Sequence, residues 1–245
     1  MAGSAVWPLR NRRAPHDEPP AGGRVGTAPP APNLHVADDV SRPSDGGRVI
    51  AGSARGVRLA APGEGTRPLG DRVKQTVFAM LEPSLPGSRF LDLFAGSGAA
   101  GIEARSRGAA EAVFIERDVG ACAVIAANLE RTGLAGGTRV IRAEALAWLR
   151  DPTRLGEPPW DLVFADAPYA ETRLLADALA AISPLLAPHG RVVAKHFWRD
   201  APPARAGLLA SERERRFGET ALTFYRRTDA DSDGAADPAT VREDG

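Results

Sequence analysis

The sequence predicts a doubly wound α/β fold, in which helices cover both faces of a largely parallel sheet. Short apolar runs typical of buried strands alternate with longer segments whose apolar residues recur at helical spacing, from residue 70 to residue 196. A glycine-rich turn joins the first of these strands to the helix after it. Beyond residue 212 the alternation gives way to two strand-like segments around Gly218, which predict a closing antiparallel hairpin.

The elements follow from these patterns in chain order. Helix 70–82 is predicted first, because Val73, Val77, Met80 and Leu81 share one face. Apolar runs then predict strands at 89–94, 111–116, 138–142, 160–165 and 190–196. The segments between them predict helices at 98–108, 118–132, 144–150 and 171–183. The final strand, 221–225, follows a tight turn at 217–220.

Both ends of the chain lack the pattern of a folded core. Residues 1–46 of the 245 contain eight prolines and almost no periodic apolar residues, which predicts a disordered arm. Residues 228–245 hold six acids against one arginine and are typical of a solvated acidic tail. We therefore expect one folded domain at residues 47–227.

The formal net charge is zero, with 31 basic and 31 acidic residues, but one segment is basic. From Arg42 to Lys74 there are seven arginines or lysines and three acids. This segment, at 48–74, is expected to follow a phosphate backbone, although an ordinary solvated face has the same composition. The candidate phosphate contacts are Arg48, Arg55, Arg58, Arg67, Arg72 and Lys74.

Cysteine and histidine usage argues against two classes of site. Cys122 is the only cysteine, so neither an intrachain disulfide nor a cysteine-cluster zinc site is expected. The four histidines show no metal-ligand spacing, and we expect no metal. No apolar run approaches the length of about 18 residues that spans a membrane, and the N-terminus has no apolar signal core. A cytoplasmic protein without membrane contact is the resulting expectation.

The turn after strand 89–94 predicts a site for a nucleotide cofactor. Gly96 and Gly98, which follow Ala95, allow a tight turn and a close approach of the backbone to a ligand. Glu116 follows Gly96 by 20 residues, at the end of the next strand, where a carboxylate can accept hydrogen bonds from both ribose hydroxyls. This arrangement fits both NAD and S-adenosylmethionine.

Two flanking acids favour S-adenosylmethionine. Asp92 lies inside the first strand, where it would approach the pyrophosphate of a dinucleotide but could bind a zwitterionic amino acid group. Glu144 follows strand 138–142, where this fold commonly contacts the adenine amine. Two alternatives remain: Asp92 as a buried cap of its own loop, and Glu144 as an acid favoured by the dipole of helix 144–150.

A second cluster follows strand 160–165. Asp166 and the carbonyl of Ala167 can each accept a hydrogen bond from an exocyclic amine, while Tyr169 offers a stacking face. With Pro168 they resemble the [DNS]-P-P-[YFW] motif of amino-methyltransferases, except that Ala167 replaces the first proline. Without the first proline the loop is less rigid, which would reduce activity unless Pro168 already restricts residue 167 to extended conformations; we favour the second interpretation. The alternatives are a helix cap for Asp166 and a rim aromatic covering the core for Tyr169.

The chain resembles the RsmD family over about residues 48–227. The resemblance includes the two motifs above, with Arg48-Val-Ile-Ala-Gly52, Thr66-Arg67-Pro68, Gly101-Ile-Glu103-Ala104 and Thr220-Ala221-Leu222 in the same order. It implies the fold of class I S-adenosylmethionine-dependent methyltransferases and methylation of the N2 amine of a guanine in 16S ribosomal RNA.

By the same resemblance, Asp92, Ala95, Gly96, Gly98, Glu116 and Glu144 would hold S-adenosylmethionine, and Asp166 to Tyr169 would hold the guanine. The basic segment would grip RNA of the small ribosomal subunit or its assembly intermediate, and the enzyme would act as a monomer. Two rival functions are an NAD-dependent oxidoreductase and a catalytically silent RNA-binding assembly factor. The first leaves the 166–169 cluster and the hairpin unexplained, and a methyl-transfer assay decides the second.

Overall fold

The computed structural model describes residues 45–63, 69–169 and 171–228. The predicted arm and tail therefore lie almost wholly outside the described residues, as does Arg67. Residues 45 and 46, which we assigned to the arm, instead begin a short strand. No helix in the described ranges is both long and apolar enough to cross a membrane.

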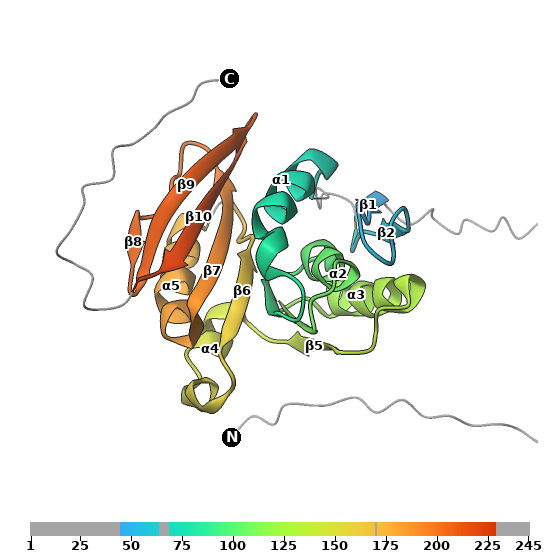
Figure 1. Ribbon diagram of the computed structural model, residues 1–245, viewed down its shortest axis with the longest axis horizontal. Helices are drawn as coiled ribbons and strands as arrows, with labels where there is room; N and C mark the ends of the chain where they lie inside the picture. The colour runs from blue at the N-terminus through green and yellow to red at the C-terminus, as the bar shows by residue number, and fades with distance from the viewer. Residues whose placement is uncertain (1–44, 64–68, 170, 229–245) are drawn as a thin grey trace, which may run out of the picture. The chain divides into compact units, whose positions relative to one another are not determined.

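An eight-stranded mixed sheet organises the fold, in the order β5-β4-β3-β6-β7-β10-β9-β8 (Figure 1). Strands β5, β4, β3, β6 and β7 are parallel, and β10, β9 and β8 are antiparallel to their neighbours. The strands are β3 (Arg89–Leu93), β4 (Glu111–Glu116), β5 (Thr138–Arg142), β6 (Trp160–Ala165), β7 (Leu186–Phe197), β8 (Arg205–Ala206), β9 (Leu209–Phe217) and β10 (Thr220–Arg227). The predicted closing hairpin is β9 and β10.

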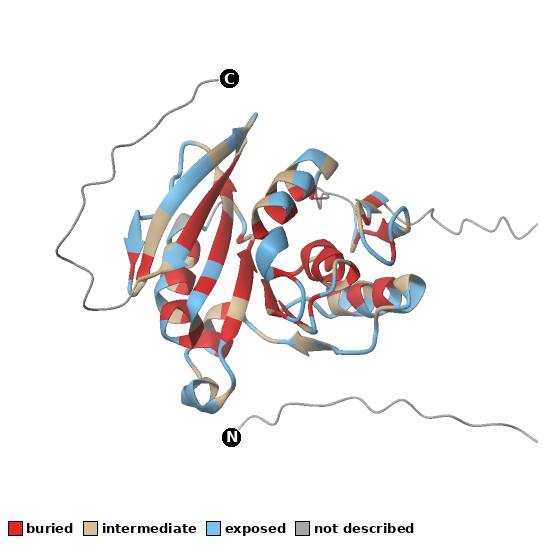
Figure 2. Cartoon of the chain, viewed as in Figure 1, coloured by how far each residue is buried: buried red, intermediate tan, exposed pale blue. Residues whose placement is uncertain are grey.

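Within the described residues, five α-helices flank the sheet, and each face of the sheet has its own core. They are α1 (Asp71–Leu81), α2 (Ala99–Ser106), α3 (Val119–Thr132), α4 (Ala145–Leu149) and α5 (Thr172–Ile182), with 3-10 segments at Glu82–Ser84, Pro152–Gly156 and Ser183–Leu185. Side chains of α1, α2 and α3 pack with Phe90 and Phe114 on one face. Those of α4 and α5 pack with Leu91 and Ile115 on the other face, so consecutive strand residues point into opposite cores. Figure 1 shows where these helices lie, and Figure 2 shows the buried residues along helices and strands.

Strand β7 is longer than the sequence pattern indicated. It begins at Leu186, four residues before the predicted start at 190. The register with β6 is irregular between the pairs Trp160–Leu186 and Leu162–Arg191, and Pro188 and Gly190 lie in that interval. Proline and glycine are typical of strand irregularities, and they interrupt the apolar run that sequence reasoning depends on.

Two buried polar side chains fix the basic segment to the domain. The segment contains the hairpin of β1 (Asp45–Arg48) and β2 (Arg58–Ala60). Glu103 of α2 accepts hydrogen bonds from the amides of Ile50 and Ala51, at 2.7 and 3.0 Å. Asn128 of α3 accepts from the amide of Ala60 at 2.8 Å and donates to its carbonyl at 2.9 Å. Because both side chains are fully buried and bonded, they hold the segment against α2 and α3.

Candidate functional site

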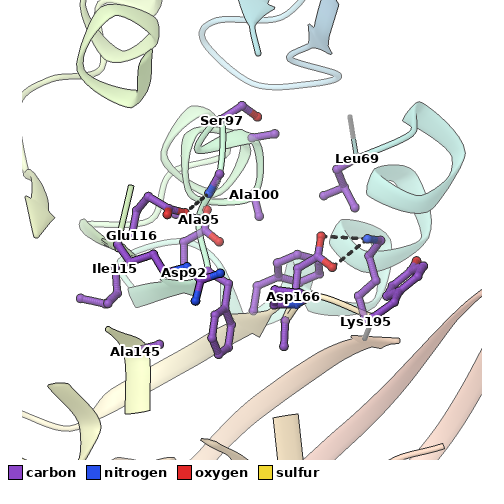
Figure 3. Close-up of a pocket in the computed structure, with 18 of the residues that line it drawn as sticks. Leu69, Asp92, Ala95, Ser97, Ala100, Ile115, Glu116, Ala145, Asp166 and Lys195 are labelled. Carbon is purple, nitrogen blue, oxygen red and sulfur yellow. Dashed lines mark hydrogen bonds and ion pairs between the residues drawn. The ribbon is translucent and has the colours of Figure 1, made fainter. Parts of the chain in front are cut away.

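A cavity of about 730 Å³ lies at the carboxyl ends of β3, β4 and β6, where ligands bind in open α/β sheets (Figure 3). Asp92 and Gly96 line it from β3 and its loop, Glu116 from β4 and Asp166 from the end of β6. Lys195 of β7 also faces it. The topology thus brings the two predicted clusters, which are about 70 residues apart in sequence, to one cavity.

The glycine turn has the backbone conformation that its sequence predicts. Gly96 and Gly98 have φ values of 55° and 75°, in the left-handed region that favours glycine. Gly101 has a different role: a Cβ atom there would lie 2.3 Å from the ring of Phe114, so only glycine lets α2 pack this closely on β4. Ala95, which lines the cavity, is buried.

Asp92 is buried at the cavity wall and bonded to the start of α2. Its Oδ2 accepts a hydrogen bond from the amide of Gly101 at 2.9 Å. Asp92 therefore makes a capping contact of the kind that the alternative interpretation expected. Burial raises the pKa of Asp92 well above its usual range, the Gly101 amide opposes this shift, and Asp166 and Glu116 add to it. The carboxylate therefore favours a cationic partner in the cavity.

Glu116 is oriented by two backbone amides. Its Oε2 accepts from Gly96 at 2.8 Å and its Oε1 accepts from Asp118 at 2.9 Å. Each carboxylate oxygen keeps a further lone pair, so Glu116 can accept hydroxyl donors while its position stays fixed (Figure 3).

Glu144 lies at the cavity rim, directly before α4. It is the N-cap residue of that helix, but its side chain makes no capping hydrogen bond. The carboxylate instead lies 3.5 Å from the guanidinium of Arg117, and both side chains are more than half exposed. Its position fits the helix-dipole alternative as well as an adenine contact.

Asp166 forms a two-point ion pair with Lys195. The ammonium Nζ lies 2.7 Å from Oδ1 and 2.9 Å from Oδ2 (Figure 3). Burial raises the pKa of Asp166, and Lys195 opposes this shift. Burial lowers the pKa of Lys195, but Asp166 and Tyr169 outweigh it and the net shift is upward. The helix-cap alternative for Asp166 is wrong, because Glu171 is the N-cap residue of α5.

Tyr169 is held at the cavity edge by neighbours on two strands. Its hydroxyl lies 2.9 Å from Oγ1 of Thr220 in β10, and its ring centroid lies 6.3 Å from that of Phe197 in β7. Lys195 places its ammonium 4.9 Å from the centroid of the Tyr169 ring. Between Asp166 and Tyr169, Ala167 is buried and Pro168 is exposed, and both line the cavity.

Lys195 and Thr220 are site residues that sequence reasoning missed. Lys195 follows the apolar residues Val192, Val193 and Ala194 in β7, and a lysine inside such a run was the available signal. A long cationic side chain in a buried strand needs an anionic partner. The sequence contains that signal but does not identify Asp166 as the partner.

One of the predicted RNA contacts is wrong. The side chain of Lys74 is fully buried: its ammonium donates to the carbonyl of Arg48 and lies 3.7 Å from Oδ1 of Asp71. It cannot reach a phosphate on the surface. Arg48, Arg55, Arg58 and Arg72 are exposed, although Arg48 is paired with Asp71 at 2.9 Å and Arg58 lies 3.8 Å from Asp45.

Known proteins share both the sequence and the fold of this chain. YlbH of Bacillus subtilis (strain 168) is 37% identical over 183 residues, which are 74% of this chain and 98% of YlbH. Ribosomal RNA small subunit methyltransferase D of Escherichia coli (strain K12) is 33% identical, over 74% of this chain and 89% of that protein. The structure of the Escherichia coli protein yhhF superposes with a TM-score of 0.64 at 33% identity, covering 75% of this chain and 98% of yhhF.

A family model described as Conserved hypothetical protein 95 matches residues 47–226. This range contains the glycine turn, both clusters of cavity residues and the closing hairpin. The chain therefore belongs to this family, the RsmD family of the sequence resemblance, and has the Rossmann-like fold of class I methyltransferases.

Proposed function

We propose that this protein transfers a methyl group from S-adenosylmethionine to the exocyclic N2 amine of a guanine in 16S ribosomal RNA. The observation that carries the proposal is that the Asp166–Tyr169 cluster and the glycine turn with Glu116 line one cavity. A cofactor site alone would suit many reactions. An amine-binding carboxylate and an aromatic ring in the same cavity suit methylation of a flat, amine-bearing base.

The residues of the β3 and β4 side fit the cofactor. Glu116 has free lone pairs for two ribose hydroxyls, and its geometry is fixed by amides of the adjoining turns. Asp92 is a buried carboxylate on the cavity wall, suited to an amino group. Ala95, Gly96 and Gly98 leave the backbone open to close approach, and Glu144 lies at the rim, within reach of an adenine amine. S-adenosylmethionine, when bound, supplies an electrophilic methyl group.

The β6 side would position the target amine. The lone pair of a guanine N2 is delocalised into the ring, so the amine is a poor nucleophile until hydrogen bonds orient it. Asp166 and the carbonyl of Ala167 would accept its two hydrogens, and Tyr169 would stack on the ring. No enzyme nucleophile is needed, and positioning with matched electrostatics would supply most of the acceleration.

Lys195 adds a requirement to this step. Both oxygens of Asp166 are engaged by its ammonium, so an incoming amine must share or displace that contact. Lys195 favours the charged form of this carboxylate before methyl transfer, because a neighbouring cation opposes the effect of burial on its pKa. Lys195 therefore acts as a positioning residue for Asp166, and Asp166 can still receive the proton that the methylated amine releases.

The exposed arginines of the basic segment would bind the phosphate backbone around the target. Glu103 and Asn128 hold the backbone of Ile50, Ala51 and Ala60 against α2 and α3, so the neighbouring arginines Arg48, Arg55 and Arg58 have a fixed support. Arg72 lies on α1. We propose the small ribosomal subunit or its assembly intermediate as the substrate particle. The support is that one relative is named ribosomal RNA small subunit methyltransferase D. Action as a monomer in the cytoplasm completes the proposal.

A single assay tests the function. Small-subunit RNA or particles that lack the modification are incubated with S-adenosylmethionine and the protein, and the product nucleosides are mapped by mass spectrometry. We expect one N2-methylguanosine with the wild-type protein and none with Asp166→Ala. A methylated adenine or cytosine would contradict the choice of base. No methylation of either RNA or particles would favour the catalytically silent assembly factor.

A further inference from the structure

A chain of aromatic rings leads from the cavity to the surface of the hairpin. Tyr169 lines the cavity, Phe197 follows at a centroid separation of 6.3 Å, and Trp198 follows Phe197 at the same separation. The planes are tilted by 45° and 52° from one ring to the next. These rings mark a continuous aromatic route from the place of the target base to Trp198.

Trp198 carries two arginines on its ring. The guanidinium carbon of Arg216 lies 3.6 Å from the ring centroid, and that of Arg199 lies 4.7 Å from it. Both arginines are exposed, and Trp198 is only half-buried, whereas Trp148 and Trp160 are 7% and 2% exposed. A large aromatic ring is thus kept partly accessible, in contact with two cations and linked through Phe197 to Tyr169 of the candidate active site.

The two arginines are held to different degrees. Arg216 donates from Nε to the carbonyl of Gly218 at 2.9 Å, which ties its guanidinium to the β9–β10 turn. The amide of Trp198 donates to the carbonyl of Glu219 in the same turn, at 3.1 Å. For Arg199, contact with the Trp198 ring is the one side-chain interaction found within the described ranges. Arg199 is therefore the cation that a ligand can displace from the ring at least cost.

A single-stranded nucleotide matches this surface. Bases stack on aromatic rings and on guanidinium planes whatever their identity, and arginines neutralise the phosphate beside them. We propose that Trp198, with Arg199 and Arg216, binds the nucleotide next to the target guanine in single-stranded RNA. The base takes the place of Arg199 on the Trp198 ring, Arg216 stays in contact with the ring, and Arg199 moves to the phosphate. This inference rests on the proposed function, since it places the target base against Tyr169.

A purely structural role is the competing explanation, in which Trp198 and Arg216 only close the hairpin. It predicts that removing the ring changes thermal stability and leaves RNA affinity unchanged in the folded protein. The test therefore measures RNA affinity and stability separately. The probe is a short single-stranded oligouridine RNA with one central guanosine, with a second version in which the uridines beside the guanosine are abasic.

Trp198→Ala is expected to weaken binding of the first RNA by about 5- to 150-fold, which corresponds to the loss of one stacked base. It should bind the abasic RNA as the wild type does, because that RNA has no base to stack. Trp198→Phe should restore most of the affinity. Equal losses on both RNAs, or no loss on either, would overturn the proposal. If Trp198→Ala does not fold, two other measurements test the proposal: the affinity of Trp198→Phe for the intact RNA, and the wild type's preference for the intact over the abasic RNA. A wild type without that preference would overturn the proposal.

Arginine variants test whether Arg199 contacts the phosphate of the bound nucleotide. Arg199→Ala should flatten the dependence of log affinity on log salt by about 0.7, the contribution of one single-strand phosphate contact, whereas Trp198→Ala should leave that slope unchanged. Arg191→Ala is the matched control, because Arg191 is exposed in the middle of β7 and precedes Trp198 by seven residues. An unchanged slope for Arg199→Ala would exclude the phosphate contact.

The outcomes separate this inference from the proposed function. Methyl transfer and S-adenosylhomocysteine binding by the wild type report on the proposed function, and oligonucleotide affinity requires neither. A protein that methylates RNA but is insensitive to Trp198→Ala would refute the stacking site alone. A protein that binds through Trp198 without methylating any RNA would refute the proposed reaction alone.

Discussion

The two sides of the cavity are held together in different ways. On the cofactor side, Asp92 and Glu116 are fixed by amides of Gly101 and Gly96, which lie 9 and 20 residues away in the chain. On the target side, Asp166 is fixed by Lys195, 29 residues away, and Tyr169 by Thr220, 51 residues away. One side uses backbone donors of the glycine turn and of the first turn of α2, and the other uses side chains from strands β7 and β10.

The difference has a physical consequence. A backbone amide is present whatever the residue, so the cofactor side depends on glycine conformation and on two carboxylates. The target side depends on pairs of side chains, and each pair is lost when either partner changes. Substitutions of Lys195 should therefore alter catalysis through Asp166, whereas the cofactor side should tolerate them.

The largest expected effect comes from Asp166→Ala. The variant should lose about two to four powers of ten in the rate of methyl transfer, the usual range for a general base or a positioning carboxylate. Its affinity for S-adenosylhomocysteine should change little, because the glycine turn is held independently. Single-turnover rates and calorimetric titration measure the two quantities. Asp166→Asn keeps an acceptor oxygen and should retain more activity than the Ala variant if alignment is the main contribution.

A double-mutant cycle with Lys195 sharpens this result. Lys195→Ala alone should lower kcat, because it leaves Asp166 without its partner, but in the Asp166→Ala background it should have no further effect. If the two substitutions lower kcat independently, Lys195 acts on the target guanine directly and not through Asp166. Lys74→Met is not a suitable control, since Lys74 is buried and supports the Arg48 backbone.

The contrast between the cofactor side and the target side also explains how much of the site could be predicted from the sequence. The glycine turn, Asp92 and Glu116 form a local pattern, since each partner follows within one βαβ unit, and the structure brings them together. The order and type of the main elements were also predicted correctly, as was the closing hairpin. Lys195 could not be paired with Asp166, because strand neighbours in space depend on the sheet order β3-β6-β7, which no local pattern contains.

The burial of Lys74 was a second feature that the sequence-based reasoning missed. Lys74 and Arg72 are close neighbours in one basic run, yet one side chain is fully buried and the other is exposed. The face of α1 decides between them: Lys74 lies near Val77, Phe78 and Leu81, which are all buried. The helical period therefore placed Lys74 on the apolar face, where its ammonium needs the Arg48 carbonyl.

Glu116→Ala tests the cofactor side. It should weaken binding of S-adenosylhomocysteine by about 1–3 kcal/mol, the usual range for a lost hydrogen bond to a charged group. Glu116→Gln is the matched variant, because it keeps one acceptor oxygen and should recover part of that loss. Isothermal titration of each variant gives the affinity. Wild-type affinity in the Ala variant would place the ribose elsewhere in the cavity.

Asp92→Asn should have the smallest effect, a change of about 1 kcal/mol in the free energy of unfolding whose size depends on pH. Burial raises the pKa of Asp92 in the folded protein, so the folded state holds this proton more tightly than the unfolded chain does. The stability that Asp92 contributes is therefore fully present below its unfolded pKa, near 4, and falls as pH rises through the folded pKa. Above that pH, the folded ligand-free protein contains a buried charge that the Asn variant lacks.

Thermal unfolding across a pH series measures this difference. Asn keeps one side-chain oxygen, which can replace Oδ2 of Asp92 as the acceptor for the Gly101 amide. The ligand-free variant should therefore melt about 2–4 °C above the wild type at pH values above the folded pKa of Asp92, and the gain should shrink towards acid pH. Affinity for S-adenosylhomocysteine should fall in the same variant, because the neutral amide no longer attracts the cofactor's amino group. A variant less stable than the wild type at every pH would show that Asp92 serves the fold rather than the ligand. In that case the structure of the cofactor side would require the Asp92 side chain, just as the target side requires Lys195 to hold Asp166.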